Sequence, residues 1–202
     1  MKKSPAFWNR VIWSDETKLN YFKSDGNQYC WRMCGEAYLP DCTQKTVKYG
    51  GGCIMLWGCM AASGVGNLVK IEGTMNSLQY LRILQENLTS SAEKLGLGSN
   101  FVFQQDNDPK HASRLLKEYF TENALDVLEW PSQSPDLNVI EHLWAYVKKK
   151  YHESPSTTKC GMYAKLLDIW NNIPPTVTRN LVNSVYRRFE SVIAAKGGAT
   201  RY

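Results

Sequence analysis

Three acidic residues stand at the ends of predicted secondary-structure elements, beside polar neighbours: Asp15, Asp106 and Glu141. Carboxylates that come close together repel one another unless a cation lies among them. Mg²⁺ takes oxygen ligands, keeps several waters, and binds through one or two carboxylates together with substrate phosphate. These residues therefore indicate phosphodiester cleavage with two metal ions, Mg²⁺ or Mn²⁺ as a substitute, and without a covalent protein nucleophile.

Most of the acidic residues in and next to this set also have a structural explanation that needs no metal site. Asp15 follows the apolar run "VIW", but Glu16 is an equal candidate because both faces of that strand are apolar. Asp108 stands before a proline, which is the pattern of a helix start, so we expect it to be structural. Glu141 is predicted near a helix N-terminus and could serve the helix macrodipole alone. Asp106 follows a strand without any capping role, which favours a functional site.

The elements that must position these acids begin with strands. Period-2 alternation and tight glycine turns predict antiparallel hairpins in the first third of the chain. The predicted strands there are "RVIWSDE" (10–16), "KLNYF" (18–22), "NQYCW" (27–31), "GGCIMLWGCMA" (51–61) and "LVKIEG" (68–73), with a turn "SDG" at 24–26. Two later strands are expected at 101–105 and 125–130.

Helical periodicity begins at Asn76, where leucines recur on one face of a helix that runs to about Leu95. The other predicted helices run from about Pro109 to Glu122, from about Val139 to Tyr151, near Tyr163 to Asn171 and from Val177 to Ala195. Strands followed by alternating helices and strands predict an α/β fold, a mixed sheet flanked by helices in the ribonuclease H-like arrangement. We expect one domain over residues 1–202, with a helical C-terminal portion from about 155.

Composition narrows the class of protein. The 202 residues are 43% hydrophobic and 12% aromatic, which predicts a folded globule. Lys and Arg number 24 against 19 Asp and Glu, so the net charge of +5 suits a polyanion partner. The start "MKKSPAFWNR" does not resemble a secretory signal, and the apolar run "CIMLWGCMAA" is too short to span a bilayer. We therefore expect no membrane partner.

The cysteines favour a reducing environment. None of the six forms a C-x-x-C pair, so we expect reduced thiols in a cytosolic or nuclear protein. A zinc site built from Cys30, Cys34 and Cys42 is the alternative.

Five long motifs resemble the Tc/mariner superfamily of DDE transposases, its Tc branch in particular. They are "SDET", "GGCIMLWGCM", "QQDNDPKH", "WPSQSPDLNVIEHLW" and "AAKGGATRY". The resemblance runs from about Ser4 to Tyr202, and its most specific part is a spacing, since 141 minus 106 is 35. That interval leaves 34 residues between the second and third acids, as in the Tc branch.

The resemblance implies which residues act and on what. The family's catalytic and metal-binding acids fall on Asp15, Asp106 and Glu141. It implies cut-and-paste transposition, in which DNA is hydrolysed at transposon ends and the freed 3′-hydroxyl attacks target DNA at a TA dinucleotide. It also implies a homodimer or higher oligomer on DNA and, in a eukaryote, a location in the nucleus.

Three departures from the family pattern accompany the resemblance. Val139 stands where a proline is expected, and His142 stands where an asparagine is common. The segment "HESPSTTKCGMYAKLLDIW" fits only loosely. Family members also carry helix-turn-helix domains ahead of this region. Without them, we expect binding to DNA chiefly through phosphates and with steep salt dependence.

Several other residues are candidates for supporting roles. Lys110 and His111 flank the second acid and could contact the scissile phosphate, although His111 could instead be a hydrogen-bonded structural histidine. Gln105 is expected at the rim of the site, and Asn138 as a helix N-cap, with substrate contact as the alternative for Asn138. The cations that could line a DNA path are Lys148, Lys149, Lys150, Arg187, Arg188, Lys196 and Arg201.

Two other functions compete with the transposase hypothesis. A ribonuclease H-like nuclease that cuts RNA:DNA hybrids would share the fold but not the long motifs. A non-catalytic DNA-binding or assembly module would have had no need to keep all three acids.

Overall fold

A computed structural model describes residues 3–21, 31–36, 39, 52–132, 134–156, 158–198, 200 and 202. Its five-stranded sheet has the order β3-β2-β1-β4-β5. The strands are β1 (Val11–Asn20), β2 (Cys53–Ala61), β3 (Gly64–Ile71), β4 (Val102–Gln104) and β5 (Asp126–Val127). The hairpin-forming strands β1, β2 and β3 are antiparallel, whereas β4 and β5 run parallel to β1. The predicted mixed sheet is therefore confirmed.

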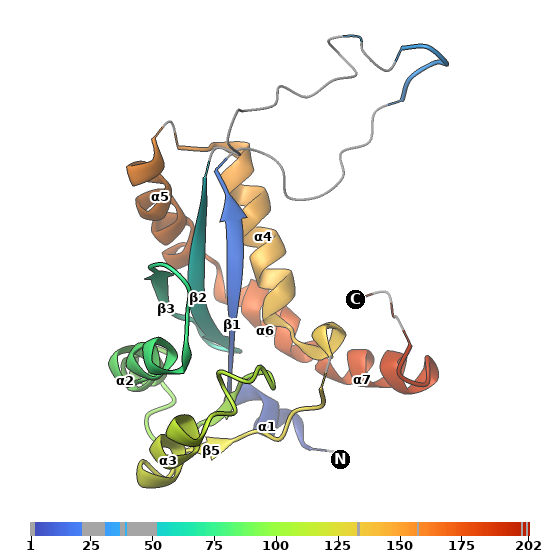
Figure 1. Ribbon diagram of the computed structural model, residues 1–202. Coiled ribbons are helices and arrows are strands. Elements are labelled where there is room, and N and C mark those ends of the chain that lie inside the picture. Colours follow the sequence, from blue (N-terminus) through green and yellow to red (C-terminus); the bar gives the residue numbers. More distant parts are fainter. Residues whose placement is uncertain are drawn as a thin grey trace.

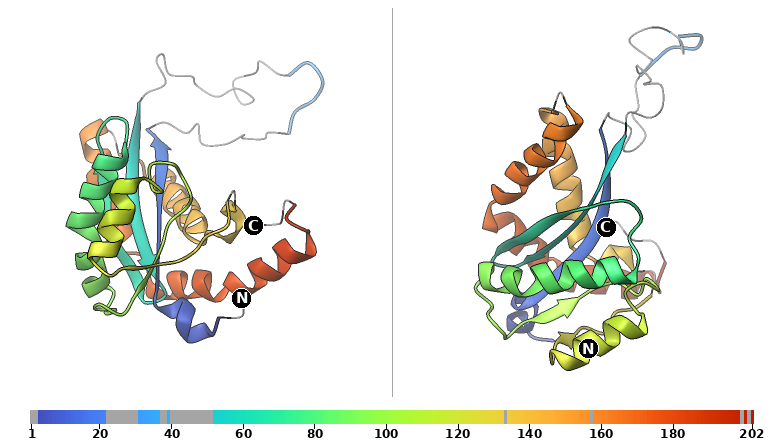
Figure 2. Two further views of the ribbon diagram at one scale, coloured as in Figure 1. Left: turned by 60° about the horizontal axis from the view of Figure 1, so that its bottom comes forward. Right: turned by 60° about the vertical axis from the view of Figure 1, so that its left-hand side comes forward.

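Helices cover both faces of this sheet (Figures 1 and 2). They are α1 (Pro5–Asn9), α2 (Ser77–Lys94), α3 (Arg114–Glu122), α4 (Ile140–Glu153), α5 (Lys159–Asn171), α6 (Pro175–Asn183) and α7 (Val185–Ala194). A 3₁₀ turn, η3 (Pro135–Leu137), precedes α4. Helices α2 and α3 lie on one face, and α4, α5 and α6 lie on the other. No helix within the described part of the chain is long and apolar enough to cross a membrane.

Two hydrophobic cores result, one on each face, and β1 contributes to both. Val11 and Trp13 belong to the core under α4, α5 and α6, while Ile12 belongs to the core under α2. Alternation along the strand sends successive side chains to opposite faces, so a strand that is covered on both sides is apolar on both. This double burial is why the sequence alone could not distinguish Asp15 from Glu16.

The prediction of two separate strands at 10–16 and 18–22 was wrong. Residues 10–16 and 18–22 do not form two strands, because β1 is continuous through Thr17 and pairs with β2 from Trp13↔Met60 to Asn20↔Cys53. Thr17 is a β-branched residue that fits a strand interior, so no break was needed there. The predicted turn at 24–26 and most of the strand at 27–31 lie outside the described residues. At 125–130 only Asp126–Val127 is strand.

Two helix predictions also need correction. Helix α3 begins at Arg114 with Ser113 as its N-cap, whereas residues 109–112 form turns rather than the predicted start at Pro109. The helix predicted from Val177 to Ala195 is two helices, α6 and α7, separated at Ser184. Helix α1 was not predicted, although Ser4 caps it with a proline at its first position.

Candidate active site

The three predicted acids line one pocket. Its cavity of about 410 Å³ is bounded by Asp15, Asp106 and Glu141 together with the loop that precedes α4. The other lining residues are Asn107, Asp108, Trp130, Pro131, Ser132, Ser134, Pro135 and Asn138. Residues that are 126 positions apart, Asp15 and Glu141, thus meet through the fold (141 minus 15).

Strand pairing brings the first two acids level with each other. β1 and β4 run in parallel with Trp13 opposite Gln104. Two residues further on, the same register places Asp106 beside Asp15, just past the carboxyl end of β4. The crevice at the carboxyl ends of strands is where open α/β sheets bind ligands. Glu141, the second residue of α4, lines the same pocket.

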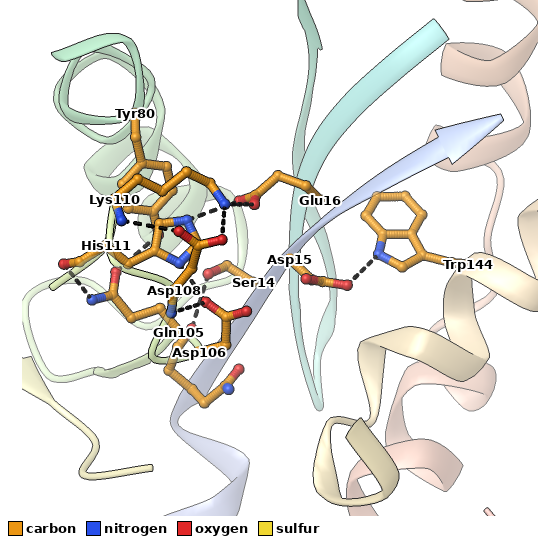
Figure 3. A network of polar contacts seen from close by, with 11 residues as sticks. Ser14, Asp15, Glu16, Tyr80, Gln105, Asp106, Asp108, Lys110, His111 and Trp144 are labelled. Atoms are coloured by element: carbon orange, nitrogen blue, oxygen red, sulfur yellow. Dashed lines mark hydrogen bonds and ion pairs between the residues drawn. The ribbon is translucent and has the colours of Figure 1, made fainter. Parts of the chain in front are cut away.

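Asp15 and Glu16 leave β1 on opposite sides, as Figure 3 shows. Asp15 points toward α4, where the indole N–H of Trp144 donates to its Oδ2 over 3.2 Å. Glu16 points the other way and lies 3.4 Å from both Lys110 Nζ and His111 Nε2. Since Asp15 lines the pocket and Glu16 does not, the structure favours Asp15 as the acid of the site.

Asp106 is held by two donors from its own loop. His111 Nδ1 lies 2.5 Å from Asp106 Oδ1, and the backbone N–H of Asp108 donates to the same oxygen over 3.1 Å. His111 is 3% exposed, and its ring lies 4.0 Å from the ring of Tyr80. His111 therefore has the structural environment that the sequence offered as its alternative. It does not line the acid pocket.

Behind this contact, polar groups form a continuous network (Figure 3). Tyr80 Oη donates to Gln105 Oε1 over 2.9 Å, and Gln105 Nε2 donates to the carbonyl of His111. Lys110 Nζ lies 2.5 Å from Asp108 Oδ2, and the Lys110 N–H also bonds that carboxylate. Asp108 therefore stabilises a turn rather than capping a helix. Gln105 supports the site from behind and is absent from the pocket lining.

The two neighbouring aspartates have opposite electrostatic environments. Burial raises the pKa of Asp15 to about 8, with further contributions from the negative charges of Glu141 and Glu16. The hydrogen bond from His111 lowers the pKa of Asp106. Burial lowers the pKa of His111, but contacts with Asp106 and Glu16 outweigh it and raise the pKa to about 9. At neutral pH the pocket thus holds an ionised Asp106 and a protonated Asp15, whose proton a cation would displace.

This donor set fits a divalent cation that prefers oxygen. All three acids line one pocket, and the pKa of Asp15 is raised first by burial and then by the negative charges of Glu141 and Glu16, which a cation would offset. Among the described residues, no three His, Cys, Asp or Glu side chains are already arranged to hold a metal ion. Mg²⁺ keeps several waters and shares substrate phosphate, so it does not require a closed cage of protein ligands.

The predicted zinc alternative mostly lies outside the described residues. Cys30 and Cys42 are not described, and Cys34 has a free, exposed thiol.

Asn138 has a different place from the one predicted. Helix α4 has no side-chain N-cap, and Asn138 lines the acid pocket instead. Its side chain is 5% exposed, yet its Oδ1 has no hydrogen-bond partner among the described residues. A buried amide oxygen without a partner is costly, so a bound ligand or water is expected to satisfy it. The sequence placed this residue beside the acid-bearing helix but gave no signal for the unpaired oxygen.

Arg188 is not a surface cation. It is 1% exposed, its Nε donates to Ser184 Oγ over 2.9 Å, and its guanidinium donates to the carbonyl of Asp136 over 2.7 Å. The hydroxyl of Thr200 donates to the Asp136 carboxylate over 2.7 Å. Arg188 therefore does not belong to a DNA path along the surface. It fixes η3, the turn that leads into the helix of Glu141.

None of the remaining predicted DNA contacts that the structure describes lines the acid pocket. Lys149 and Arg187 are exposed and Lys148 is half-buried, and none of the three lines the pocket. Lys150 pairs with Glu153, Lys196 follows α7, and Arg201 lies outside the described residues.

Val139 and His142, the two departures from the family pattern beside Glu141, do not remove Glu141 from the pocket. Val139 has φ −69°, which is the value that a proline would impose, so the backbone enters α4 in the same way. His142 is exposed and its ring lies 6.2 Å from that of Tyr202.

Comparison with known proteins identifies relatives over nearly the whole chain. Residues 10–160 match the family described as DDE superfamily endonuclease. The Tcb1 transposable-element transposase of Caenorhabditis briggsae is 42% identical over 198 residues, covering 98% of this chain and 72% of that protein.

Two solved structures share the fold. A mariner Mos1 paired-end complex with Mg superposes with a TM-score of 0.82 and 19% identity, over 96% of this chain and 58% of that chain. The Mos1 transposase catalytic domain with raltegravir and Mn superposes with a TM-score of 0.74 and 18% identity, over 97% of this chain and 87% of that chain. These likenesses confirm the ribonuclease H-like fold.

Proposed function

Because the chain belongs to the DDE superfamily endonucleases, in the Tc branch of the Tc/mariner transposases, we propose that it is the catalytic part of a cut-and-paste DNA transposase. The observation that carries this proposal is the meeting of Asp15, Asp106 and Glu141 in one pocket. Its reaction would be hydrolysis of phosphodiester bonds at transposon ends, followed by strand transfer into target DNA at TA.

Divalent cations are the cofactor that this site suits. Two Mg²⁺ ions, or Mn²⁺ in their place, would supply an activated attacking oxygen and charge stabilisation for the leaving oxygen. Asp15, Asp106 and Glu141 would hold them. The Mos1 structures with Mg and with Mn support this choice of ions.

The protein's own residues prepare the pocket in three ways. Asp15 releases its proton as positive charge enters, because its raised pKa comes from burial and from neighbouring acids. His111 and the Asp108 N–H keep Asp106 ionised and fixed in direction. Arg188 and Thr200 hold η3, which sets the entry of Glu141 into the pocket.

DNA is the proposed partner, in the form of transposon ends and a TA target. The net charge of +5 favours a polyanion, and exposed Lys149 and Arg187, with Lys148, are the proposed phosphate contacts. We also propose a homodimer or larger oligomer on DNA, since two ends must be cut and joined, and a nuclear location. The paired-end complex of Mos1 supports the assembly.

Nicking of supercoiled plasmid in Mn²⁺ tests the proposed activity without requiring recognition of a particular end sequence. The unchanged chain should convert supercoiled to open-circular DNA, and Asp106→Asn should abolish the conversion. Asp168→Asn is the matched control, because Asp168 is an exposed residue of α5 outside the pocket. Equal nicking by the unchanged chain and Asp106→Asn would contradict the proposal, as would no nicking at all.

A further inference from the structure

Trp144 joins the helix of one acid to the side chain of another. Its indole N–H donates to Asp15 Oδ2 over 3.2 Å, within the normal range of such bonds (Figure 3). It follows Glu141 by three residues on α4, so the two side chains share one side of the helix. A single helix therefore carries one acid of the pocket and the donor that contacts a second acid.

The position of this indole is fixed by a glycine in the sheet. Gly58 on β2 lies directly opposite Asp15 in the β1–β2 register. A Cβ atom at Gly58 would lie 2.7 Å from Cη2 of Trp144 and 3.0 Å from Cη2 of Trp170. The Trp144 ring thus occupies space that any other residue at 58 would fill, which brings its N–H beside Asp15.

A second tryptophan, Trp170, packs against the Trp144 ring and also lies close to Gly58. The rings of Trp144 and Trp170 stack at 5.1 Å with 27° between their planes. Trp170 is itself anchored, because its Nε1–H donates to the carbonyl of Gly66 over 2.9 Å. Trp144 is 1% exposed, so its ring is confined on the Gly58 side and on the Trp170 side. A donor that is held this firmly can fix the direction of the carboxylate that it contacts.

We propose that Trp144 is a positioning residue for Asp15, and that Gly58 provides the space which allows it. The indole N–H occupies Oδ2 of Asp15, so Oδ1 would be the oxygen left to bind a cation. This inference rests on the proposed metal-dependent function. Groups that orient a metal ligand typically change metal affinity or activity about 10–100-fold when they are lost.

Removal of the indole N–H tests the inference. Trp144→Phe keeps an aromatic ring at this position but has no donor, and we expect its dissociation constant for Mn²⁺ to rise about 10–100-fold. Free Mn²⁺ is measured by electron paramagnetic resonance, at one pH, on protein without DNA. Trp144→benzothienylalanine is the shape-matched version, since sulfur replaces the N–H in the same bicyclic ring, and it should weaken binding similarly.

Trp57→Phe is the matched control. Trp57 is also fully buried, but it lies in the core on the other face of the sheet, and its indole N–H has no hydrogen-bond partner among the described residues. The same loss of ring size there should leave Mn²⁺ affinity unchanged. Gly58→Ala is an independent test of the same role, because it keeps the Trp144 N–H but displaces its ring. This variant should also weaken Mn²⁺ binding.

Asp15→Asn separates failure of the inference from failure of the proposed function. If Asp15→Asn loses Mn²⁺ binding while both Trp144 variants bind as tightly as Trp57→Phe, the positioning role is wrong and the metal site stands. If the unchanged chain binds no Mn²⁺, or Asp15→Asn binds it equally well, the proposed metal site fails and the inference fails with it.

Discussion

At the scale of single residues, the site is built from acids in contrasting environments. Asp106 is half-exposed and has a positively charged histidine beside it, whereas Asp15 is enclosed among other acids. Asp106 is ionised, and a cation would lower the raised pKa of Asp15, so the pocket responds to a cation. The same contrast makes the stability of the cation-free protein depend on pH.

We expect the cation-free chain to lose stability as the pH rises from about 4 to about 9, first through Asp15 alone and above about 6.5 through His111 as well. The folded-state pKa of Asp15 is raised to about 8, so folding retains a proton that the unfolded chain releases, and stability falls as the pH rises toward 8. The pKa of His111 is raised to about 9, so its contribution is complete below its ordinary 6.5 and is lost through 9. Asp106 has a lowered pKa, so its contribution to the stability of the folded protein is lost only at acidic pH.

Melting temperatures in EDTA measure this effect. A loss on the order of 1 kcal/mol would lower the melting temperature by about 2–4 °C in a chain of this size. Asp15→Asn should show a shallower fall over the same range because one of the two groups is gone. Identical slopes for the two proteins would show that the proton on Asp15 does not contribute.

Asn138→Ala should separate activity from stability. The variant removes a buried amide whose Oδ1 has no partner, so the melting temperature should stay the same or rise. Plasmid nicking should fall, because Asn138 lines the pocket and its free oxygen is available to substrate or water. A variant that nicks DNA normally would show that this oxygen has no role in the reaction.

Sequence reasoning identified the acids but not the groups that position them. Asp106 was singled out because it had no other role, and Glu141 because of its spacing from Asp106. The contacts of Trp144 and Arg188 could not be predicted, since one resembles an ordinary core residue and the other a surface cation. Each makes its key contact with a residue more than 50 positions away, as the Trp144 to Asp15 separation of 129 and the Arg188 to Asp136 separation of 52 show.

At the scale of elements, the turn η3 links the C-terminal helices to the acid pocket. Arg188 on α7 bonds the carbonyl of Asp136, and Thr200 bonds its carboxylate. Leu137 and Val139, on either side of Asn138, are buried. The start of α4, and with it Glu141, is therefore held by contacts from the end of the chain.

Arg188→Met should destabilise the protein by about 1.5–3 kcal/mol, because it removes the hydrogen bonds of a charged group to the Ser184 hydroxyl and to the partly buried carbonyl of Asp136. Urea unfolding measures this. Arg187→Met is the matched control, since Arg187 is exposed on the same helix and its replacement should stay within about 0.5 kcal/mol. Equal stability for the two variants would show that the Arg188 hydrogen bonds do not stabilise η3.

Element boundaries were predictable where one local signal dominated. Helix α2 has Asn76 as its N-cap and ends with Lys94, close to the expected limits. The α6–α7 break was missed because the helical pattern continues across Ser184, whose hydroxyl bonds the carbonyl of Leu181 and accepts from Arg188. That contact depends on the tertiary fold rather than on local propensity.

At the scale of the whole molecule, an excess of positive charge should govern binding to DNA. We expect affinity for a duplex to fall about a hundredfold between roughly 50 and 200 mM salt if about four phosphates are neutralised. Fluorescence anisotropy with labelled duplex measures this. Lys149→Ala and Arg187→Ala should each reduce the magnitude of the log–log slope by about 1. Binding that does not depend on salt would exclude phosphate contacts as its main source.

The overall architecture was predictable from the order of strands and helices, because a mixed sheet with helices on both faces is one of few ways to bury them. The convergence of the acids was not visible in the order of elements alone. It depends on the parallel β1–β4 register and on the path of the loop before α4, which bring three distant segments to one pocket.

Anomalous diffraction at the manganese edge, from crystals soaked in Mn²⁺, tests the central claim most directly. The account predicts anomalous peaks within the pocket, at ligand distance from carboxylate oxygens of Asp15, Asp106 and Glu141. Crystals of Asp106→Asn should lose this density. A pocket without manganese at saturating Mn²⁺, or manganese bound only elsewhere on the molecule, would contradict the account.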